Sequence, residues 1–243
     1  MLRKKTLKVL SVDWDFFQNV DIETLFYYPD GHDLPTTLSS MIWANHYAND
    51  KENEKLQKVT VNETKLRELL DILMNQKHNT PIAIVQSHIH IYDFILSHMK
   101  DYDRCDITNI DMHHDMFNDN EELDCGNWVS HIKKTIPESN IKWIANLISL
   151  EAYGLDKLPI EYDFESIKNK KFDLIFICRS DIWSPPHLDK YFNMIVERVQ
   201  MHFDSMLTQK EILKPRDIKD AVDSIREMNK QMLSEFNQRK ANK

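Results

Sequence analysis

A mostly apolar run, residues 107–110, leads directly into a segment that carries two carboxylates and two imidazoles. Such a run is typical of a buried strand. Side chains alternate in an extended segment, about 6.6 Å apart at every second residue, so Asp111, His113 and Asp115 are expected on one side. Carboxylate and imidazole groups together suit a divalent ion such as Mn²⁺ or Zn²⁺. The alternative is a solvated acidic loop with incidental histidines, but such a loop needs no apolar strand before it.

A second acidic pair follows another apolar segment near the beginning of the sequence. Residues 6–12 are apolar or β-branched for the most part, and Asp13 and Asp15 come directly after them, framed by Trp14 and Phe16. Two carboxylates at one strand end can both reach a single metal cluster. An aspartate in a turn is common after strands and would explain one of the two residues, but it explains the pair poorly.

Two further strand ends carry polar side chains. Residues 81–85 predict a buried strand, and His88 stands between its end and a helix expected over 89–99. Open α/β sheets bind ligands at this position, so His88 is a candidate metal ligand. Residues 172–178 predict another strand, which leads to Asp181. Asp181 is a candidate metal ligand, a substrate contact or a plain turn residue.

The loop after the acidic cluster contains three residues of interest. Gly126 permits a positive φ, which would let the chain turn tightly beside the cluster. Asn127 and His131 follow it, and each is either a substrate contact or a solvated loop residue.

Strands and helices alternate along the chain. A strand is expected over 141–147, and helices are expected over 62–76, from the prolines at 185 and 186 to about 206, and over about 215–238. This alternation predicts an α/β fold, a three-layer αβα arrangement with a mostly parallel, doubly wound sheet. The 243 residues suit one domain, 1–243, with an insertion at about 18–60 and the C-terminal helix at about 215–238. The C-terminal ends of parallel strands share one edge, so the polar strand ends should converge there.

Composition narrows the class of protein. A net charge of −8 argues against nonspecific nucleic-acid binding, which needs a basic surface. The three cysteines are widely spaced without a CxxC pair, as in reduced cytoplasmic proteins. No apolar run has the length of a membrane span or a signal peptide, so we expect a soluble cytoplasmic protein with no membrane partner.

The candidate ligands outnumber what a single zinc ion takes. Four carboxylates and two imidazoles are available, and the excess of carboxylates favours Mn²⁺. This number of candidate ligands predicts two ions about 3.5 Å apart with a bridging hydroxide. Such a nucleophile would attack a planar carbon, as in a guanidinium or an amide. The six side chains are Asp13, Asp15, His88, Asp111, His113 and Asp115.

These motifs resemble those of the arginase–deacetylase superfamily. The segment 111–115 resembles the D-x-H-x-D motif of that family, and 11–15 looks like its S-x-D-x-D segment. Ser87-His88 looks like its histidine after a strand, and 125–127 resembles its small-Gly-Asn element. Arginases place S-x-D-x-D late in the chain, where Ser180-Asp181 stands here. The early D-x-D followed by Phe16-Phe17 is most similar to the ornithine-forming peptide arginases.

The resemblance implies an arginase-like fold, two Mn²⁺ ions, and hydrolysis of arginine in a ribosomally made precursor peptide to ornithine and urea. It implies that Asp111 and either Asp13 or Asp181 bridge the ions. His88 and Asp115 would complete one ion, and His113 and Asp15 the other. His131 becomes a candidate proton shuttle by its position, and Asn127 a candidate substrate contact. An acidic residue holds the guanidinium in arginases; Glu151 is a loose match, and Asp181 would serve if it is not on the metal.

The sequence alone leaves three alternative functions open. One is a ureohydrolase of a free guanidino compound such as arginine or agmatine. Another is a deacetylase-like metal amidohydrolase, whose single Zn²⁺ needs fewer carboxylates. The third is a noncatalytic, metal-stabilised binding module.

Overall fold

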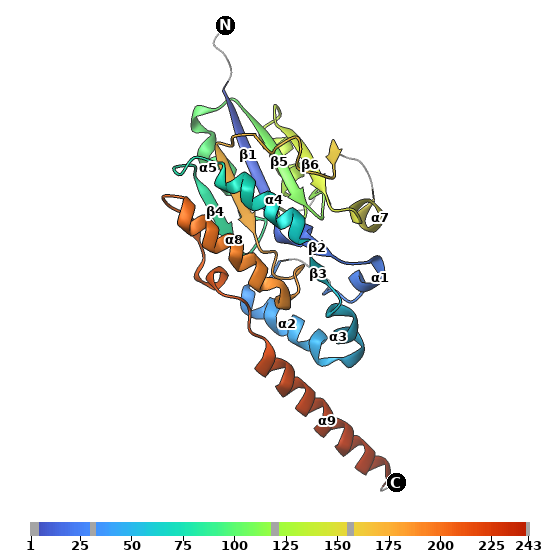
Figure 1. Cartoon of the computed structure of the whole chain (residues 1–243). Helices are drawn as coiled ribbons and strands as arrows, with labels where there is room; N and C mark the ends of the chain where they lie inside the picture. The colour runs from blue at the N-terminus through green and yellow to red at the C-terminus, as the bar shows by residue number, and fades with distance from the viewer. Residues whose placement is uncertain (1–4, 30–32, 118–121, 155–157, 242–243) are drawn as a thin grey trace.

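Seven parallel strands form the central sheet of the computed structural model, which describes residues 5–29, 33–117, 122–154 and 158–241 (Figure 1). Each neighbouring pair in this sheet is parallel. The predicted α/β class is therefore confirmed, and the architecture is consistent with a three-layer, arginase-like fold. In spatial order the strands are β7 (Ile160–Glu161), β6 (Asn140–Ala145), β5 (Arg104–Asp111), β1 (Thr6–Asp13), β8 (Leu174–Cys178), β4 (Ile82–Val85) and β9 (Leu207–Thr208).

The first strand of the chain lies at the middle of the sheet. On one side β1 pairs with β5, where Val12 aligns with Ile110. On the other side it pairs with β8, where Asp13 aligns with Cys178. Because these strands run in the same direction, the acidic residues that follow β1 and β5 emerge at the same edge.

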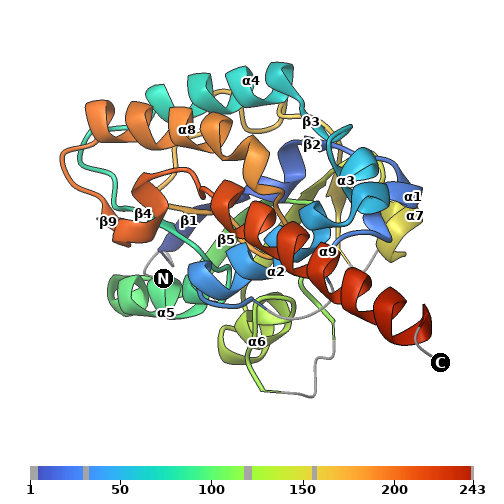
Figure 2. The ribbon, with the colours of Figure 1, turned by 90° about the horizontal axis from the view of Figure 1, so that it is seen from below.

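Helices cover both faces of the sheet, as Figure 2 shows. On one face lie α4 (Glu63–Met74) and α8 (Asp189–His202), whose apolar side chains belong to one buried cluster. On the other lie α5 (His90–His98) and α6 (Trp128–Thr135), which contribute to a second cluster. Strand β1 feeds both clusters, with Leu10 and Val12 in the first and Leu7 and Val9 in the second. This alternation is what the two-sided burial of a parallel strand requires.

The segment expected to be an insertion, about 18–60, is mainly helical outside residues 30–32. It contains α1 (Ile22–Leu25), α2 (Thr36–Ala48) and α3 (Asp50–Leu56), between the short antiparallel strands β2 (Gln18–Asn19) and β3 (Thr60–Val61). The charged run at 50–55 lies in helix α3, which is capped by the Asn49 side chain. Helix α2 buries Trp43, whose indole N–H donates to the Asp181 carbonyl oxygen at 2.9 Å. The segment thus packs against the strand ends.

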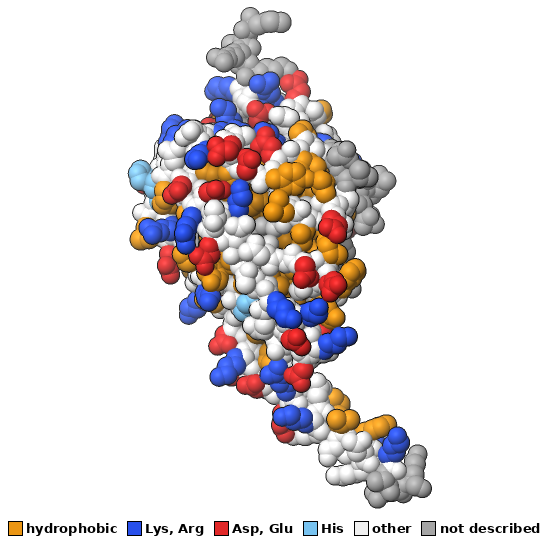
Figure 3. All heavy atoms as spheres, turned by 45° about the vertical axis from the view of Figure 1, so that its right-hand side comes forward, with side chains coloured by type: hydrophobic (Ala, Val, Ile, Leu, Met, Phe, Trp, Pro, Cys, Tyr) orange, Lys and Arg blue, Asp and Glu red, His pale blue; other side chains and the backbone are white. Residues whose placement is uncertain are grey.

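The last helix, α9 (Lys219–Ala241), begins against the body of the protein and then extends away from it (Figures 1 and 3). Its first turns carry Ala221, Val222 and Ile225, which pack on the first buried cluster. Further along, apolar side chains are exposed, namely Met228, Met232, Leu233 and Phe236. Among the helices in the described part of the chain, none has the length and apolar character needed to cross a membrane.

Candidate metal centre

Six side chains from three strand ends meet at one edge of the sheet. Asp13 ends β1, Asp15 lies in the 3-10 helix Trp14–Phe17 that follows, and His88 lies between β4 and α5. Asp111 ends β5, and His113 and Asp115 come just after it. None of the six is more than 8% exposed. The structure thus brings together the residues that the spacing of the sequence singled out.

His88 is the centre of the first group. Its Nδ1 atom lies 3.2 Å from Oδ2 of Asp13, 3.2 Å from Oδ2 of Asp111 and 3.1 Å from Oδ2 of Asp115. Although it faces three carboxylates, this buried nitrogen has no hydrogen-bond partner among the described residues. Neighbouring ligands of an octahedral divalent ion stand about 3 Å apart. The spacing and the unpaired nitrogen therefore fit a metal position among these four atoms.

The second group contains Asp15, Asp111 and His113. Nδ1 of His113 lies 2.9 Å from Oδ2 of Asp15 and 3.7 Å from Oδ1 of Asp111. Oδ2 of Asp15 is buried, and within the part of the chain that the structure describes it has no hydrogen-bond partner. Asp111 therefore presents Oδ2 to the His88 group and Oδ1 to the His113 group, as a carboxylate shared by two ions would.

The pKa values of the carboxyl and imidazole groups in the centre are shifted because many negative charges are buried close together. Burial, followed by the nearby Asp13 carboxylate, raises the pKa of Asp15 to about 8. Burial opposes a charge on the His113 ring, but the Asp15 carboxylate and other neighbours raise the pKa of that ring well above its usual value. Buried charges are stable only when they are paired, and without metal the raised pKa values of Asp15 and His113 mean that protons offset part of the charge of the four carboxylates. Two divalent ions would supply a matching charge of +4.

The ligand side chains are held by neighbours that sequence reasoning did not single out. The Ser11 hydroxyl lies 2.7 Å from Nε2 of His88, which leaves Nδ1 to face the carboxylates. The Trp128 indole N–H donates to Oδ2 of Asp115 at 2.5 Å. Partners of this kind fix the orientation of metal ligands. Ser11 had a usable signal, as the first residue of the S-x-D-x-D pattern; Trp128 had none beyond following Asn127.

A third group of potential ligands joins Asp13 and His88 to a thiol. One ligand atom from each of Asp13, His88 and Cys178 lies within 4.8 Å of the other two. Ser180, two residues after Cys178, has a positive φ of 49°. Its hydroxyl donates to Oδ2 of Asp13 at 2.5 Å. Cys178 at the end of β8 and Ser180 just after it therefore lie beside the potential ligands Asp13 and His88.

A cavity of about 330 Å³ opens onto the centre. Three aromatic residues form much of its wall, and their rings surround His113, with centroid distances of 4.4 Å for Tyr153, 5.0 Å for Trp183 and 6.4 Å for Phe117. No lysine or arginine is among the described residues that line it. The lining residues are Asp13, His88, His113, Asp115, Phe117, Asp124, Cys125, Gly126, Tyr153, Ser180 and Trp183.

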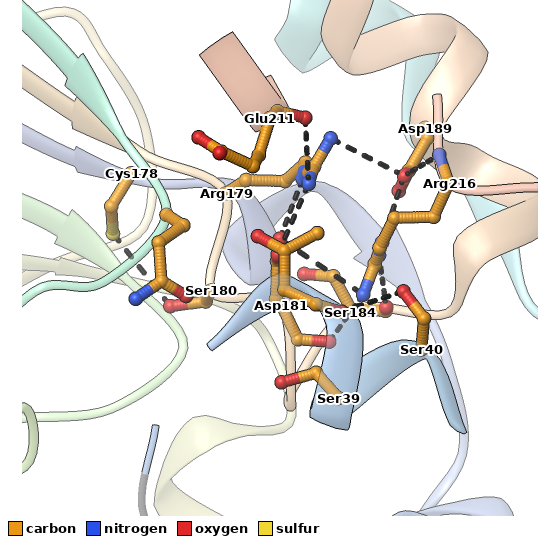
Figure 4. A network of polar contacts seen from close by, with 12 residues as sticks. Ser39, Ser40, Cys178, Arg179, Ser180, Asp181, Ser184, Asp189, Glu211 and Arg216 are labelled. Carbon is orange, nitrogen blue, oxygen red and sulfur yellow. Dashed lines mark hydrogen bonds and ion pairs between the residues drawn. The ribbon is translucent and has the colours of Figure 1, made fainter. Parts of the chain in front are cut away.

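Asp181, the alternative metal ligand, lies in a different arrangement. Figure 4 shows its side chain directed at the Arg179 guanidinium, which donates from Nε to Oδ1 at 2.5 Å and from Nη2 to Oδ2 at 3.0 Å. Arg216 pairs in turn with Asp189, and all four residues are buried. Asp181 belongs to none of the groups that could hold a metal. The expectation that it binds metal or substrate is therefore corrected, because its charge is already neutralised by Arg179.

The Asn127 side chain holds the loop together and does not line the cavity. Oδ1 of Asn127 accepts from the Asp124 amide at 2.9 Å, and its Nδ2 donates to the Glu122 carbonyl at 2.8 Å. A fully buried side chain with both ends engaged does not offer itself to substrate, so the expected contact is corrected. Gly126 does not have the expected positive φ, which belongs to Asp115 (51°) instead.

His131 and Glu151 also lie outside the cavity lining. His131 is on α6, where its ring stands edge-on against Tyr92 with centroids 6.2 Å apart. Glu151 is exposed on the short helix α7 (Ser149–Tyr153), whose last residue, Tyr153, does line the cavity. Neither side chain lines the cavity, so the structure does not support His131 as the proton shuttle or Glu151 as the guanidinium contact.

The geometry around Asp111 differs in one respect from the sequence expectation. The strand ends at Asp111, and Asp115 adopts a left-handed backbone, so simple alternation along an extended segment does not bring the three side chains together. A sharp turn does so instead. The neighbouring His114 turns away, with its Nδ1 accepting from the Met116 amide at 2.9 Å.

In comparisons with known proteins, no family model, no curated protein and no solved structure matched the chain.

Proposed function

We propose that the protein is a Mn²⁺-dependent arginase that converts arginine residues of a precursor peptide to ornithine and releases urea. The observation that carries the proposal is the paired geometry of the centre, where two groups of carboxylate and imidazole ligands share Asp111. Bound there, two Mn²⁺ ions would lower the pKa of a shared water molecule and so provide a nucleophile near neutral pH.

The cavity suits a planar cation. Its charged lining is acidic or imidazole, and Trp183 and Tyr153 present aromatic faces beside His113. Aromatic faces and carboxylates both attract a guanidinium group. A neutral amide would gain less from this environment, and one ion would leave the Asp15 group unused. These two points favour an arginase over a deacetylase-like amidohydrolase.

The choice of a peptide substrate depends on the motifs. The early S-x-D-x-D segment, Asp13 and Asp15 included, resembles the peptide arginases, and β1 places it directly beside the D-x-H-x-D strand. The position of β1 also explains how this segment serves the centre from the beginning of the chain. With Asp13 and Asp15 supplied by this early segment, Asp181, which stands where arginases have their late S-x-D-x-D segment, is not needed as a ligand.

The deciding experiment is mass spectrometry of a single-arginine peptide incubated with the protein and Mn²⁺. We expect a product lighter by the elements of cyanamide, together with one equivalent of urea. Free arginine, agmatine and an acetyl-lysine peptide are tested in parallel. Urea only from the free compounds would replace the peptide substrate, loss of acetate would indicate the deacetylase-like alternative, and no reaction in any arm would leave a metal-stabilised binding module.

A further inference from the structure

Cys178 is a free thiol at the end of β8, and neither of the proposed manganese positions uses it. Its side chain is fully buried and belongs to the second apolar cluster, as is common for a free cysteine. Its sulfur nevertheless lies 3.6 Å from the Ser180 hydroxyl (Figure 4), and that hydroxyl donates to Asp13. The thiol therefore stands at the border between the apolar core and the polar centre.

The register of the sheet places Cys178 beside Asp13 and His88. Cys178 aligns with Asp13 on the neighbouring strand β1, and aligned residues of parallel strands point to the same face. The His88 ring stacks on Phe176, with centroids 5.8 Å apart and an angle of 6° between the planes. Phe176 stands two residues before Cys178, so their side chains share that face of β8. The arrangement explains why one ligand atom from each of Asp13, His88 and Cys178 lies within 4.8 Å of the other two.

The His88 ring gives independent evidence for an ion at this place. Its side chain is 2% exposed, and its Nδ1 atom has no hydrogen-bond partner among the described residues, although it lies 3.2 Å from Oδ2 of Asp13. A buried polar atom without a partner is costly unless a ligand engages it. Sulfur, imidazole nitrogen and carboxylate oxygen are together the ligand types that Zn²⁺ takes in proteins, with water in the fourth position of an open site.

We propose that Asp13, His88 and Cys178 form a binding site for a thiophilic divalent ion such as Zn²⁺, and that this ion excludes manganese from the first metal position. Burial raises the pKa of the thiol well above its usual value, so without an ion the sulfur keeps its proton. Binding breaks the S–H bond, forms a metal–sulfur bond and releases the proton to water. One thiolate and one carboxylate then neutralise the divalent ion.

The two ions compete because they need the same side chains. A hard ion such as Mn²⁺ prefers the oxygens of Asp111 and Asp115, whereas a soft ion prefers the sulfur of Cys178, and both use Asp13 and His88. A protein loaded with zinc at this site therefore holds manganese at the Asp15 group alone. The inference rests on the metal centre of the function proposed above, but not on its peptide substrate.

The first test adds one equivalent of Co²⁺, a spectroscopic substitute for Zn²⁺, to the metal-free full-length protein. We expect a sulfur-to-cobalt charge-transfer band in the near ultraviolet, because a thiolate ligand produces such a band and oxygen and nitrogen ligands do not. Cys178→Ala should abolish it. Cys105→Ala, in the same apolar cluster, and Cys125→Ala, on the cavity wall, are the matched controls and should retain it. The absence of a band in wild type, or its survival in Cys178→Ala, would overturn the proposal.

The second test measures selectivity by competition with a chelator. In Cys178→Ala we expect the affinity for Zn²⁺ to fall at least about tenfold, while the affinity for Mn²⁺ at both positions stays within about twofold. Retained manganese binding also shows that the variant folds. An unchanged zinc affinity would show that the sulfur is not a ligand, and equal losses for both ions would show only a general disturbance of the centre; either result contradicts the proposal.

A third test needs no variant. X-ray absorption at the zinc edge of wild type loaded with one Zn²⁺ should show one sulfur ligand at about 2.3 Å. One equivalent of Zn²⁺ should also release one Mn²⁺ from protein loaded with two. A shell of nitrogen and oxygen alone, or no release of manganese, overturns the proposal. None of these readouts depends on hydrolysis, so an inactive protein with the zinc–sulfur bond would refute the peptide arginase alone, and an active protein without that bond would refute the zinc site alone.

Discussion

Asp15 and His113 come from two different strand ends, and Nδ1 of the histidine lies 2.9 Å from Oδ2 of the aspartate. Among the described residues the oxygen has no hydrogen-bond partner, although it faces a ring nitrogen. Two ligand atoms held this close without a hydrogen bond between them fit a common third partner such as a metal ion. At His88 the unpartnered atom is the ring nitrogen Nδ1, which faces three carboxylates of the described chain without a hydrogen bond to any of them. The predictions below follow from these two arrangements.

Asp111→Asn should disturb both metal positions, because Asp111 offers one oxygen to each. We expect manganese content to fall from near two ions per chain to one or less, and urea production to fall by at least about a thousandfold. Circular dichroism should show a retained fold. Asp106→Asn, on the same strand but outside the centre, is the control. A variant that retains both ions and activity would remove Asp111 from the centre.

Metal binding at the Asp15 group should depend on pH. Below its folded pKa of about 8, Asp15 holds a proton that an ion must displace. The apparent affinity for the ion at the Asp15 group should therefore rise between pH 6 and 8, about tenfold per pH unit for each proton displaced. Above pH 8 the affinity should level off. Electron paramagnetic resonance of free Mn²⁺ measures it. An affinity that is the same at pH 6 and pH 8 would contradict this assignment.

Ser11→Ala should weaken metal binding without touching a ligand. The Ser11 hydroxyl is the partner of Nε2 of His88, and losing such a partner typically costs about 10-fold to 100-fold in metal affinity. We expect the effect at the His88 position only, measured by competition with a chelator. Ser97→Ala on α5, outside the centre, should leave both affinities unchanged. Equal weakening of both ions would speak against a specific role for Ser11.

The arginine network should matter for stability and not for metal. Arg179→Ala leaves Asp181 buried without its main partner, and such losses cost about 3–5 kcal/mol. Urea denaturation measures this. Asp181→Asn should keep two manganese ions per folded chain, in contrast to Asp111→Asn. Loss of an ion in Asp181→Asn would restore this residue to the list of ligands.

The stability difference between wild type and Asp33→Asn should vary with pH. Burial raises the pKa of the carboxyl to about 6 in the folded protein, against 3.8 as its ordinary value, so the folded state binds the proton more tightly. Wild type is therefore penalised as the pH rises from about 4 to 6, by up to about 3 kcal/mol, and the penalty is constant above that. Unfolding of both proteins from pH 4 to 8, without metal, measures the difference. A stability difference that does not grow with pH would show that the charged Asp33 carboxylate does not destabilise the folded protein.

Sequence reasoning worked where chemistry and periodicity coincide. Asp13, His88 and Asp111 each stand at the end of an apolar run, and a parallel sheet gathers such ends at one edge. It failed for Asp181, because this residue pairs with Arg179 two positions before it, and the network with Arg216 that encloses the pair arises from tertiary contacts. Residues whose role depends on packing were also missed.

The segment at 18–60 belongs to this last class, because α2 buries Ser39, Trp43 and Ala44 without a regular apolar pattern. Phe117, Tyr153 and Trp183 were missed as cavity walls for a similar reason, since aromatic residues in loops or at the end of a short helix carry no periodic signal. A sequence can therefore indicate the ligands of such a centre more readily than the walls around it.

The central place of β1 in the sheet determines when the centre can form during synthesis. Its neighbours β5 and β8 follow far later in the chain, and Asp13 gains its Ser180 hydrogen bond only after β8 has been made. A nascent chain thus carries Asp13 and Asp15 exposed for most of its growth, and pairings over such long separations are slow to form. Manganese is expected to enter only after β8 has been made, so starving cells of the metal should yield a folded but empty chain that can be loaded afterwards.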